Sequence, residues 1–314
     1  MTKVSILIPV FNREQFISEC IQSALNQTFT DLEIVVVDNA SDDSTWEICQ
    51  RFSEQDSRVR VYRNDRNIGP VRNWQRCIDE ATGEYGKFLF SDDLIFPNFL
   101  SETLPKLSDE SIGFVSTAAF IGTELENSEV CYASSQSAEM ISTEKYLGRL
   151  ANGYPAVPVS PGAAIFRMAD IRKNLLLEVP TEVLHDFTKN GAGPDVLLFA
   201  LTVKDYASIL MLNQPLVFFR KHAGSFSVAN DESAVTEGYR LALGWFFRKH
   251  SSLKHWASFL AKIWLSNAKL NRGFESPIST IKRYSGTGTQ QEIAMVLLTS
   301  IQHVVVKLFH RKFF

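Results

Sequence analysis

Short apolar runs and amphipathic stretches alternate along the first hundred residues. Runs rich in Val and Ile are typical of strands buried on both faces, and they predict strands at residues 4–10, 33–37, 58–62 and 85–90. Between them, apolar residues recur at helical spacing over residues 14–26, 44–53 and 71–81. Strands that alternate with helices predict an α/β fold, in which helices cover both faces of a mostly parallel sheet.

The pattern is less regular after residue 110. It predicts strands at residues 111–120, 208–213 and 215–220, and a short apolar segment at 163–166. Helices are predicted at 143–150, from about residue 169, and at 196–202, and the polar stretch up to residue 137 is predicted to be a loop. We therefore expect an α/β domain at residues 1–228 and a helical region at 229–314.

Composition narrows the class of protein. The four cysteines, Cys20, Cys49, Cys77 and Cys131, are scattered without metal-ligand spacing, which is typical of core residues in a reducing compartment. The apolar run at the N-terminus is too short for a signal peptide, so we expect a cytoplasmic protein. No G-x-G-x-x-G follows the first strand and no G-x-x-x-x-G-K-[ST] occurs, which argues against nicotinamide-dependent dehydrogenases and P-loop enzymes.

Charge is distributed unevenly along the chain. From Tyr239 onward, 12 Lys and Arg stand against Glu275 and Glu292, about +10, so the rest carries about −13 of the net charge of −3. Apolar residues recur at helical spacing over 253–268 and again over 293–309, which predicts amphipathic helices. Such a basic tail favours an anionic membrane surface, rather than nucleic acid, as its partner. The alternative is packing on the rest of the chain or on a second subunit of a homo-oligomer.

Two adjacent carboxylates, Asp92 and Asp93, follow the apolar run at residues 87–90. Ligands of open α/β sheets bind outside the carboxyl ends of the strands. Two carboxylates there repel each other unless a cation or hydrogen-bond donors compensate, and a divalent metal held against a diphosphate would do so. The alternative is that Asp93 caps the next turn and that Asp92 is merely solvated.

Five short motifs occur in order along residues 3–228. They are Ile8-Pro9-Val10-Phe11-Asn12, residues 35–45 around Asp38, Asn67-Ile68-Gly69 with Arg72-Asn73, Ser91-Asp92-Asp93 with Pro97, and Arg220-Lys221-His222-Ala223-Gly224-Ser225-Phe226-Ser227. In this order and spacing they resemble the family-2 glycosyltransferases with the GT-A fold. The resemblance implies a Rossmann-like domain that binds a nucleotide-diphosphate sugar and transfers the sugar with inversion, followed here by a helical appendage.

Several segments are expected to contact the nucleotide sugar. Asp38 ends a buried strand, where its carboxylate can accept the imide N–H of uracil or thymine or a ribose hydroxyl. Gly69 permits close backbone approach, and Arg72 is placed to contact the diphosphate or to lie solvated. By resemblance, the remaining contacts come from Pro9, Val10, Phe11, Asn12, Asn67, Ser91, Asp92 and Asp93.

The resemblance also implies a metal site for Mg²⁺ or Mn²⁺. Asp92 matches the metal-binding member of the family's Asp-Ser-Asp-Asp motif, whereas Phe90 stands in place of the leading aspartate. The loss of that carboxylate predicts a weaker site that relies more on the diphosphate. His222, in an Arg-x-His-x-x-Ser setting, is the second predicted ligand; the alternative is that it only orders its loop.

Asp195 is the predicted base by resemblance, although Pro194 replaces the family's usual Glu before it. A carboxylate at a helix N-terminus is favoured as the anion, so burial would have to raise its pKa for it to act as a base. Asp186 is the alternative base, and a simple helix-capping role for Asp195 is the structural alternative.

These residues predict an inverting, membrane-associated glycosyltransferase. It would use a UDP- or dTDP-sugar to extend a cell-surface polysaccharide or glycolipid, with a glycan or lipid-linked molecule as acceptor. A non-catalytic protein of the same fold that binds carbohydrate or a partner is the alternative. A sugar-nucleotide pyrophosphorylase is disfavoured, because the first strand leads into Pro-Val-Phe-Asn and not into a glycine-rich loop.

Overall fold

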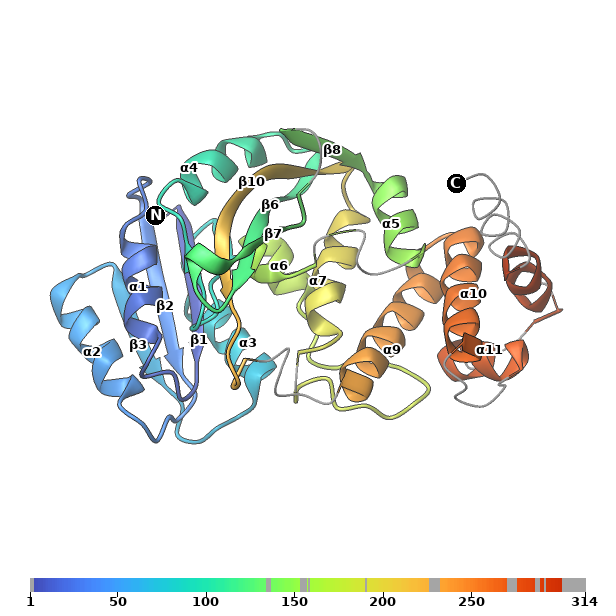
Figure 1. Ribbon diagram of the computed structural model, residues 1–314, viewed down its shortest axis with the longest axis horizontal. Coiled ribbons are helices and arrows are strands. Elements are labelled where there is room, and N and C mark those ends of the chain that lie inside the picture. Colours follow the sequence, from blue (N-terminus) through green and yellow to red (C-terminus); the bar gives the residue numbers. More distant parts are fainter. Residues whose placement is uncertain are drawn as a thin grey trace.

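One mixed sheet forms the centre of the molecule (Figure 1). The computed structural model describes residues 3–133, 137–152, 157, 159–189, 191–225, 232–269, 276–285, 289–290 and 292–300. Along the sheet the strand order is β3-β2-β1-β4-β9-β6-β10-β5, with β7 beside β6 and β8 beside β10. The strands are β1 (Val4–Val10), β2 (Leu32–Asp38), β3 (Val59–Arg63), β4 (Tyr85–Phe88), β5 (Leu94–Ile95), β6 (Ile112–Gly122), β7 (Glu129–Cys131), β8 (Ala138–Ser142), β9 (Ala164–Arg167) and β10 (Ser208–Arg220).

Six strands of this sheet run in the same direction. β1 is parallel to β2 and β4, β2 is parallel to β3, and β6 is parallel to β10. β9 is antiparallel to both β4 and β6, which gives the two parallel groups a common direction. The carboxyl ends of β1, β2, β4 and β10 therefore lie along one edge of the sheet. The expected α/β fold with a mostly parallel sheet is confirmed.

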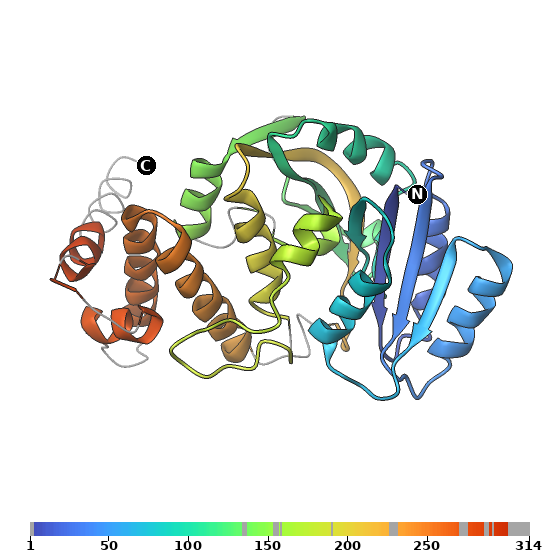
Figure 2. The ribbon, with the colours of Figure 1, turned by 180° about the vertical axis from the view of Figure 1, so that it is seen from behind.

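Helices cover both faces of the parallel strands (Figure 2). They are α1 (Ile17–Leu25), α2 (Thr45–Gln55), α3 (Pro70–Glu80), α4 (Phe99–Thr103), α5 (Thr143–Asn152), α6 (Met168–Asn174) and α7 (Pro194–Val203). Side chains alternate between the faces of a strand. In β1, Ile6 and Ile8 join the apolar cluster of α1 and α2, whereas Leu7 joins the cluster of α3.

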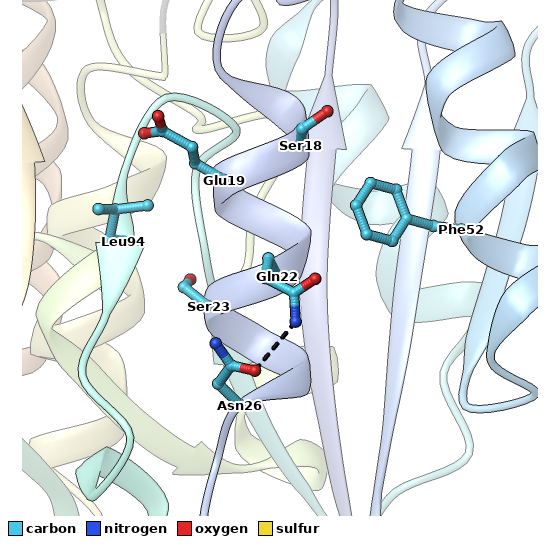
Figure 3. A pocket seen from close by; sticks show the side chains of 7 residues that line it. All are labelled: Ser18, Glu19, Gln22, Ser23, Asn26, Phe52 and Leu94. Carbon is cyan, nitrogen blue, oxygen red and sulfur yellow. Dashed lines mark hydrogen bonds between the residues drawn. The ribbon is translucent and has the colours of Figure 1, made fainter.

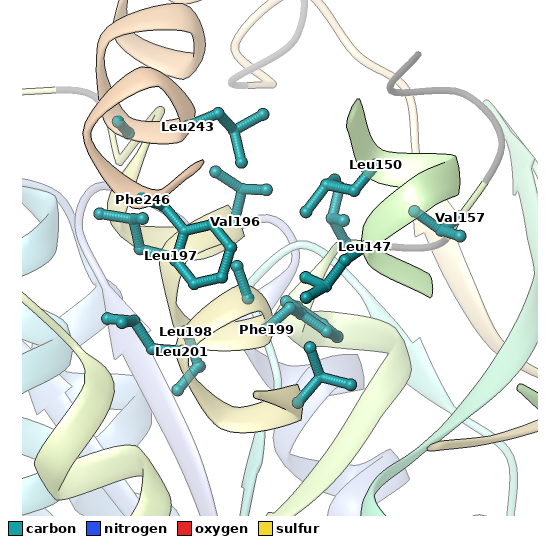
Figure 4. Close-up of a cluster of buried hydrophobic side chains, with 14 of the residues drawn as sticks. Leu147, Leu150, Val157, Val196, Leu197, Leu198, Phe199, Leu201, Leu243 and Phe246 are labelled. Atoms are coloured by element: carbon teal, nitrogen blue, oxygen red, sulfur yellow. The ribbon is translucent and has the colours of Figure 1, made fainter. Parts of the chain in front are cut away.

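The C-terminal helices pack on the α3 side. They are α9 (Glu232–His250), α10 (Leu253–Lys269) and α11 (Pro277–Ser285). Figure 4 shows Val196 and Leu197 of α7 near Leu243 and Phe246 of α9, and all four belong to one buried cluster. One apolar core thus continues from the sheet into the C-terminal helices, and the boundary predicted at residue 228 lies outside the described residues.

The apolar face of α10 is buried inside the protein. Trp256, Phe259, Leu260 and Ile263 are at most 6% exposed, and they belong to the same cluster as α9. For this helix the structure therefore bears out the alternative of packing on the rest of the chain. Of the second predicted amphipathic helix, residues 292–300 are helical and residues 301–309 lie outside the described part. In the described portion of the chain, no helix is long and apolar enough to cross a membrane.

Several predicted bounds are wrong. β4 ends at Phe88 and not at residue 90. Leu89 still donates its backbone N–H to the carbonyl of Leu7, whereas the carbonyl of Phe90 accepts the N–H of Asp93 in a turn. The two strands predicted at 208–220 are one strand, β10, whose register shifts around Pro215, a residue without an N–H to donate. The polar stretch before residue 137 is not wholly a loop, since it contains β7 and a short 3₁₀ helix at Leu125–Asn127.

Replacement of Phe114 should strongly destabilise the fold. This residue of β6 is fully buried, and its ring packs against those of Tyr146, Phe166 and Phe199 at centroid distances of 5.7, 5.3 and 4.9 Å. We expect Phe114→Ala to lower the free energy of unfolding by about 3–5 kcal/mol in urea titrations. Leu125→Ala is the control, at a site that is 38% exposed, and it should lower the free energy of unfolding by less than about 0.5 kcal/mol. Equal losses in the two variants would contradict the placement of Phe114 in the core.

Candidate active site

Asp92 and His222 meet at the carboxyl edge of the sheet. The turn after β4 carries Asp92, and the segment after β10 carries His222, whose Nε2 lies 2.9 Å from Asp92 Oδ2. The Nε atom of Arg13, in the loop after β1, lies 3.7 Å from the same oxygen. Arg13 also donates to the carbonyl of Gly224 at 2.9 Å. Three segments far apart in the sequence therefore converge on one carboxylate.

Asp93 points into the protein, unlike Asp92. It is 8% exposed, and its Oδ1 accepts the backbone N–H of Arg220 at 3.0 Å. Burial raises the pKa of Asp93 well above its usual range, and the neighbouring Asp92 raises it further. Asp93 therefore anchors the turn to β10 and is not positioned as a solvent-facing ligand.

The guanidinium of Arg220 holds this corner together. It donates to the backbone carbonyl of Asp92 at 3.2 Å and pairs with Glu19 at 2.6 Å. It also lies 5.1 Å from the ring centroid of Phe16, which packs in turn on His222 at 4.6 Å. Arg220 and Phe16 thus fix the side chains around the candidate metal ligands.

A buried lysine lies beneath the same turn. Lys87 of β4 is fully buried and donates to the carbonyls of Phe88, at 2.6 Å, and Gly162. Burial lowers its pKa to about 7, while the carboxylate of Asp93 opposes that change. Lys87 thus lies within electrostatic reach of Asp93, beneath the turn that carries both aspartates.

Asp38 ends β2 and is fully buried in this structure. Its carboxylate accepts the hydroxyl and the backbone N–H of Ser41 and pairs with Arg63 Nε at 3.1 Å. Asp38 therefore shapes the loop after β2, and its predicted contact with the base or ribose stays a prediction.

Four asparagines link the ends of β2 and β3 to α3. Asn64 donates to Asn39 at 2.9 Å and to Asn73 at 2.8 Å, and Asn73 donates to the carbonyl of Val37 at 2.9 Å. Asn39 also donates to Oδ1 of Asn67 at 2.9 Å. Asn67, itself exposed at this edge, is thereby held in place by buried amides.

The other predicted contact residues differ in exposure. Pro9 and Val10 are buried as the last residues of β1, and Ser91 is 6% exposed. Phe11 is 38% exposed, and Asn12, with φ of 50°, accepts the N–H of Asp42 through its side chain. Arg72 is exposed on the first turn of α3.

The segment before α7 lies against the N-terminal half of α3. A Cβ on Gly69 would be 3.2 Å from the Thr188 carbonyl, and one on Gly191 would be 2.6 Å from the Trp74 ring. Trp74 also packs on Phe90, at 5.4 Å between ring centroids. Asp195, four residues after Gly191, is therefore brought to the same edge as Asn67, Gly69 and the turn that follows Phe90.

Asp195 lies in the first turn of α7. Pro194 occupies the first helical position, where a missing N–H costs nothing. Oδ1 of Asp195 accepts the N–H groups of Gly193 at 3.0 Å and Val196 at 2.7 Å, and Oδ2 accepts the Tyr239 hydroxyl at 2.6 Å. Burial raises the pKa of Asp195 to about 6, although all three hydrogen bonds favour the anion.

Asp186 is in a different environment. It is exposed, and bonds from the hydroxyl and N–H of Thr188 hold its pKa below the usual range. A base that works near neutral pH needs a pKa close to that pH. The two environments favour Asp195 over Asp186 as the base.

The donor set at this edge fits a weakly held divalent cation. The carboxylate of Asp92 is a ligand that suits Mg²⁺ and Mn²⁺, the imidazole of His222 can add a nitrogen ligand, and Mg²⁺ uses few protein carboxylates when phosphates supply further oxygens. Within the described ranges, no group of three or more His, Cys, Asp or Glu is arranged to hold a metal. Phe90 contributes a ring to the Trp74 and Phe88 cluster at the position where the family's extra carboxylate would lie.

A shallow groove of about 450 Å³ lies elsewhere, on the outer face of α1 (Figure 3). Ser18, Glu19, Gln22, Ser23, Asn26, Phe52 and Leu94 line it. None of these is a predicted site residue. Glu19, the partner of Arg220, and Leu94, which follows Asp93, connect the groove to the site.

Sequence reasoning missed four residues that shape the site: Arg13, Phe16, Lys87 and Tyr239. Arg13 follows directly after the first motif, so its position next to that motif could have identified it as a site residue. Tyr239 lies 44 positions after Asp195, and no spacing rule connects the two.

Solved structures show the same fold. S. aureus TarS 1–349 in complex with UDP-GlcNAc matches with a TM-score of 0.68 and 19% identity, over 94% of this chain and 84% of that one. The complex of TarS 1–349 with UDP gives 0.66 and 18%, over 94% and 83%. The molecule is thus a protein of the α/β GT-A fold with additional C-terminal helices.

Sequence comparison then defines the family. The glycosyltransferase GlyG of Streptococcus pneumoniae serotype 4 is 25% identical over 224 residues, 71% of this chain and 72% of GlyG. The GalNAc(5)-diNAcBac-PP-undecaprenol beta-1,3-glucosyltransferase of Campylobacter jejuni is 36% identical over 110 residues, 35% of this chain and about a third (36%) of that relative. The model of glycosyl transferase family 2 matches residues 5–174, more than half of the chain. The chain therefore belongs to glycosyl transferase family 2 and is a glycosyltransferase.

The raised pKa of Asp195 predicts a pH-dependent gain in stability for Asp195→Asn. The folded pKa is about 6 and the unfolded value about 3.9. Between these values the folded state binds more protons, so Asp195 lowers stability as the pH rises through this window. Asn carries no charge, and its oxygen can still accept the two amide bonds.

At pH 7.5 we expect the free energy of unfolding of Asp195→Asn to exceed that of the wild type by at most about 3 kcal/mol. Its melting temperature should therefore also be higher. The difference should vanish near pH 4. Asp186→Asn, which removes a carboxyl with a lowered pKa, should not gain stability at pH 7.5. A constant difference for Asp195→Asn across this pH range would contradict the assignment.

Proposed function

We propose that this protein is an inverting glycosyltransferase that moves a sugar from a UDP- or dTDP-sugar to a hydroxyl of a growing cell-surface glycan or glycolipid. The observation that carries the proposal is Asp195. Its carboxyl is partly buried at the carboxyl edge of the sheet, and burial raises its pKa to about 6. That value suits a base that must be ionised near neutral pH and still accept a proton.

A single displacement needs one base. Asp195 would take the proton of the acceptor hydroxyl as its oxygen attacks the anomeric carbon from the face opposite the diphosphate. The bond to the diphosphate breaks in the same step, which inverts the configuration. No second carboxylate is required, because no covalent intermediate forms.

The opposite side of the site is suited to a diphosphate. Arg13, Arg220 and His222 surround Asp92, and exposed Arg72 begins α3. Cationic donors placed where negative charge develops lower the barrier to departure of the diphosphate. Asp92 and His222 would hold Mg²⁺ or Mn²⁺, which when bound supplies further positive charge to the diphosphate oxygens.

The relatives support the choice of substrates. S. aureus TarS 1–349 was solved with UDP-GlcNAc and with UDP, which favours a uridine donor here. The C. jejuni relative is named for an undecaprenol-PP-linked substrate, which supports a lipid-linked acceptor.

A lipid-linked acceptor would require access to a membrane surface. Apolar side chains are exposed in the C-terminal region at Ile278, Leu297 and Leu298, with Lys282 and Arg283 nearby in the sequence. This combination is typical of a surface that binds anionic lipid. We include peripheral binding to the cytoplasmic face of the membrane in the proposal.

Donor binding should raise the melting temperature. With ligand at about 100 times its Kd, the gain is about 2.7 kcal/mol. We expect UDP with Mn²⁺ to raise the melting temperature more than UDP with EDTA, and CDP or GDP to have little effect. Asp92→Asn should lose the Mn²⁺-dependent part, whereas Asp79→Asn, at an exposed residue of α3, should keep it. Failure of every nucleoside diphosphate to shift the melt would refute the donor assignment.

Asp195→Asn should abolish turnover without loss of donor binding. A general base contributes about 10²–10⁴-fold to the rate, so release of UDP from UDP-sugars should fall by at least about 100-fold while the UDP-induced melting shift stays unchanged. Asp186→Asn should retain activity. A wild-type protein that binds UDP-sugars but never cleaves them would favour the non-catalytic alternative.

A further inference from the structure

Two structural elements hold the carboxylate of Asp195. The N-terminal turn of α7 provides the N–H groups of Gly193 and Val196 to Oδ1, and α9 provides the hydroxyl of Tyr239 to Oδ2. A carboxylate has about four acceptor sites, two on each oxygen. The two amides thus hold Oδ1, and Tyr239 of α9 holds Oδ2.

The approach of α9 to this point depends on small residues. A Cβ on Gly238 would lie 2.6 Å from the Ala192 carbonyl, so only glycine lets the helix backbone come this close. One turn later, the Cβ of Ala242 lies 3.1 Å from the position of a Cβ on Gly193. The contact between the two segments thus fixes Tyr239, the residue after Gly238, against Asp195.

Below this contact the two helices share the apolar core. Leu243 and Phe246 of α9 lie near Val196 and Leu197 of α7 (Figure 4), and all four are at most 4% exposed. On the other side of α9, Glu237 pairs with Arg283 of α11 at 2.7 Å. Packing therefore determines the position of Tyr239 independently of its bond to Asp195.

We propose that Tyr239 is a positioning residue for the base, and that α9 thereby makes the C-terminal helices part of the active site. The proposal rests on Asp195 being the base of the proposed function. Tyr239 keeps its own proton and holds Oδ2 in one orientation. The transferred proton leaves the acceptor oxygen and binds the carboxylate of Asp195.

Other charged and titratable groups also face this contact. His185, in the segment before α7, faces Gly238, with Nε2 3.1 Å from the position of a Cβ on that residue. On α9, Glu237 pairs with Arg283, and Arg240 donates to Asn267. Asp186 and Arg72 interact with each other on the α3 side. The pH profile of Asp195 is therefore expected to respond chiefly to Tyr239, whose bond favours the anion.

The first test measures the titration of Asp195 in the full-length protein without any ligand. Infrared difference spectra between pH 4 and 9, with Asp195→Asn as reference, report the carboxyl directly. We expect Tyr239→Phe to raise the pKa of Asp195, because the anion loses a donor. Tyr284→Phe is the control: it removes the hydroxyl of a second tyrosine, which is buried and contacts Glu237 at 3.2 Å, and it should leave the titration unchanged.

A second variant tests whether the effect of Tyr239→Phe comes from altered packing and not from the lost hydrogen bond. Fluorotyrosine at position 239 keeps the ring and the bond but is a stronger hydrogen-bond donor, so it should lower the pKa of Asp195. Opposite shifts for Phe and fluorotyrosine support the proposal, and an unchanged pKa in both variants overturns it.

The third measurement is release of UDP from UDP-GlcNAc with Mn²⁺ as a function of pH. Tyr239→Phe should lower kcat between about tenfold and a hundredfold, since the base is no longer held in one orientation. It should move the acid limb of the pH–rate profile to higher pH and leave KM within about twofold of the wild-type value. An unshifted acid limb in Tyr239→Phe, when Asp195→Asn is inactive, overturns the positioning role alone. Full activity of Asp195→Asn overturns the proposed function, while the titration still decides whether Tyr239 controls Asp195.

Discussion

The common direction of β1, β2, β4 and β10 is the constraint on which the site depends. Hydrogen bonding in register places Val10 beside Asp38, and β1 beside β4, so the loops that follow these strands leave the sheet at one edge. β10 joins the same edge through its parallel pairing with β6. The antiparallel strand β9 connects the two groups without reversing either. Without this arrangement Asp92 and His222, 130 residues apart, would not meet.

At this edge of the sheet an acidic and a basic side chain are buried close together. Asp93 and Lys87 are both buried, and burial favours the neutral form of each. The side chain of Asp92 is 15% exposed and contacts Arg13 and His222. The pair of carboxylates therefore divides into an inner one that holds the turn on β10 and an outer one that can meet a cation. The sequence favoured Asp92 as the metal ligand, and only the structure shows what Asp93 contacts.

At Asp195 two physical effects oppose each other. The N-terminus of α7 and the Tyr239 hydroxyl stabilise the anion, while burial destabilises it. Burial is the larger effect, and the resulting pKa of about 6 is suited to proton removal near neutral pH. Helix α9 packs on α7 and brings the Tyr239 hydroxyl to Asp195, so the C-terminal helices contribute to the site as well as to the core.

The sequence by itself determined the class of fold, the order of its strands and helices, and the motifs at the strand ends. These features depend on local periodicity and on residue types at fixed spacing, which are visible along the chain: β1 has the predicted bounds, and Asp38, Asp92 and Asp195 lie at or near the ends of elements. Only the tertiary structure decided that Asp93 points inward, that Pro215 lies within one irregular strand, that α10 buries its apolar face, and that Tyr239 reaches Asp195. Each of these depends on contacts between residues far apart in the sequence, where the energy of packing and the burial of charge, and not local preference, select the arrangement.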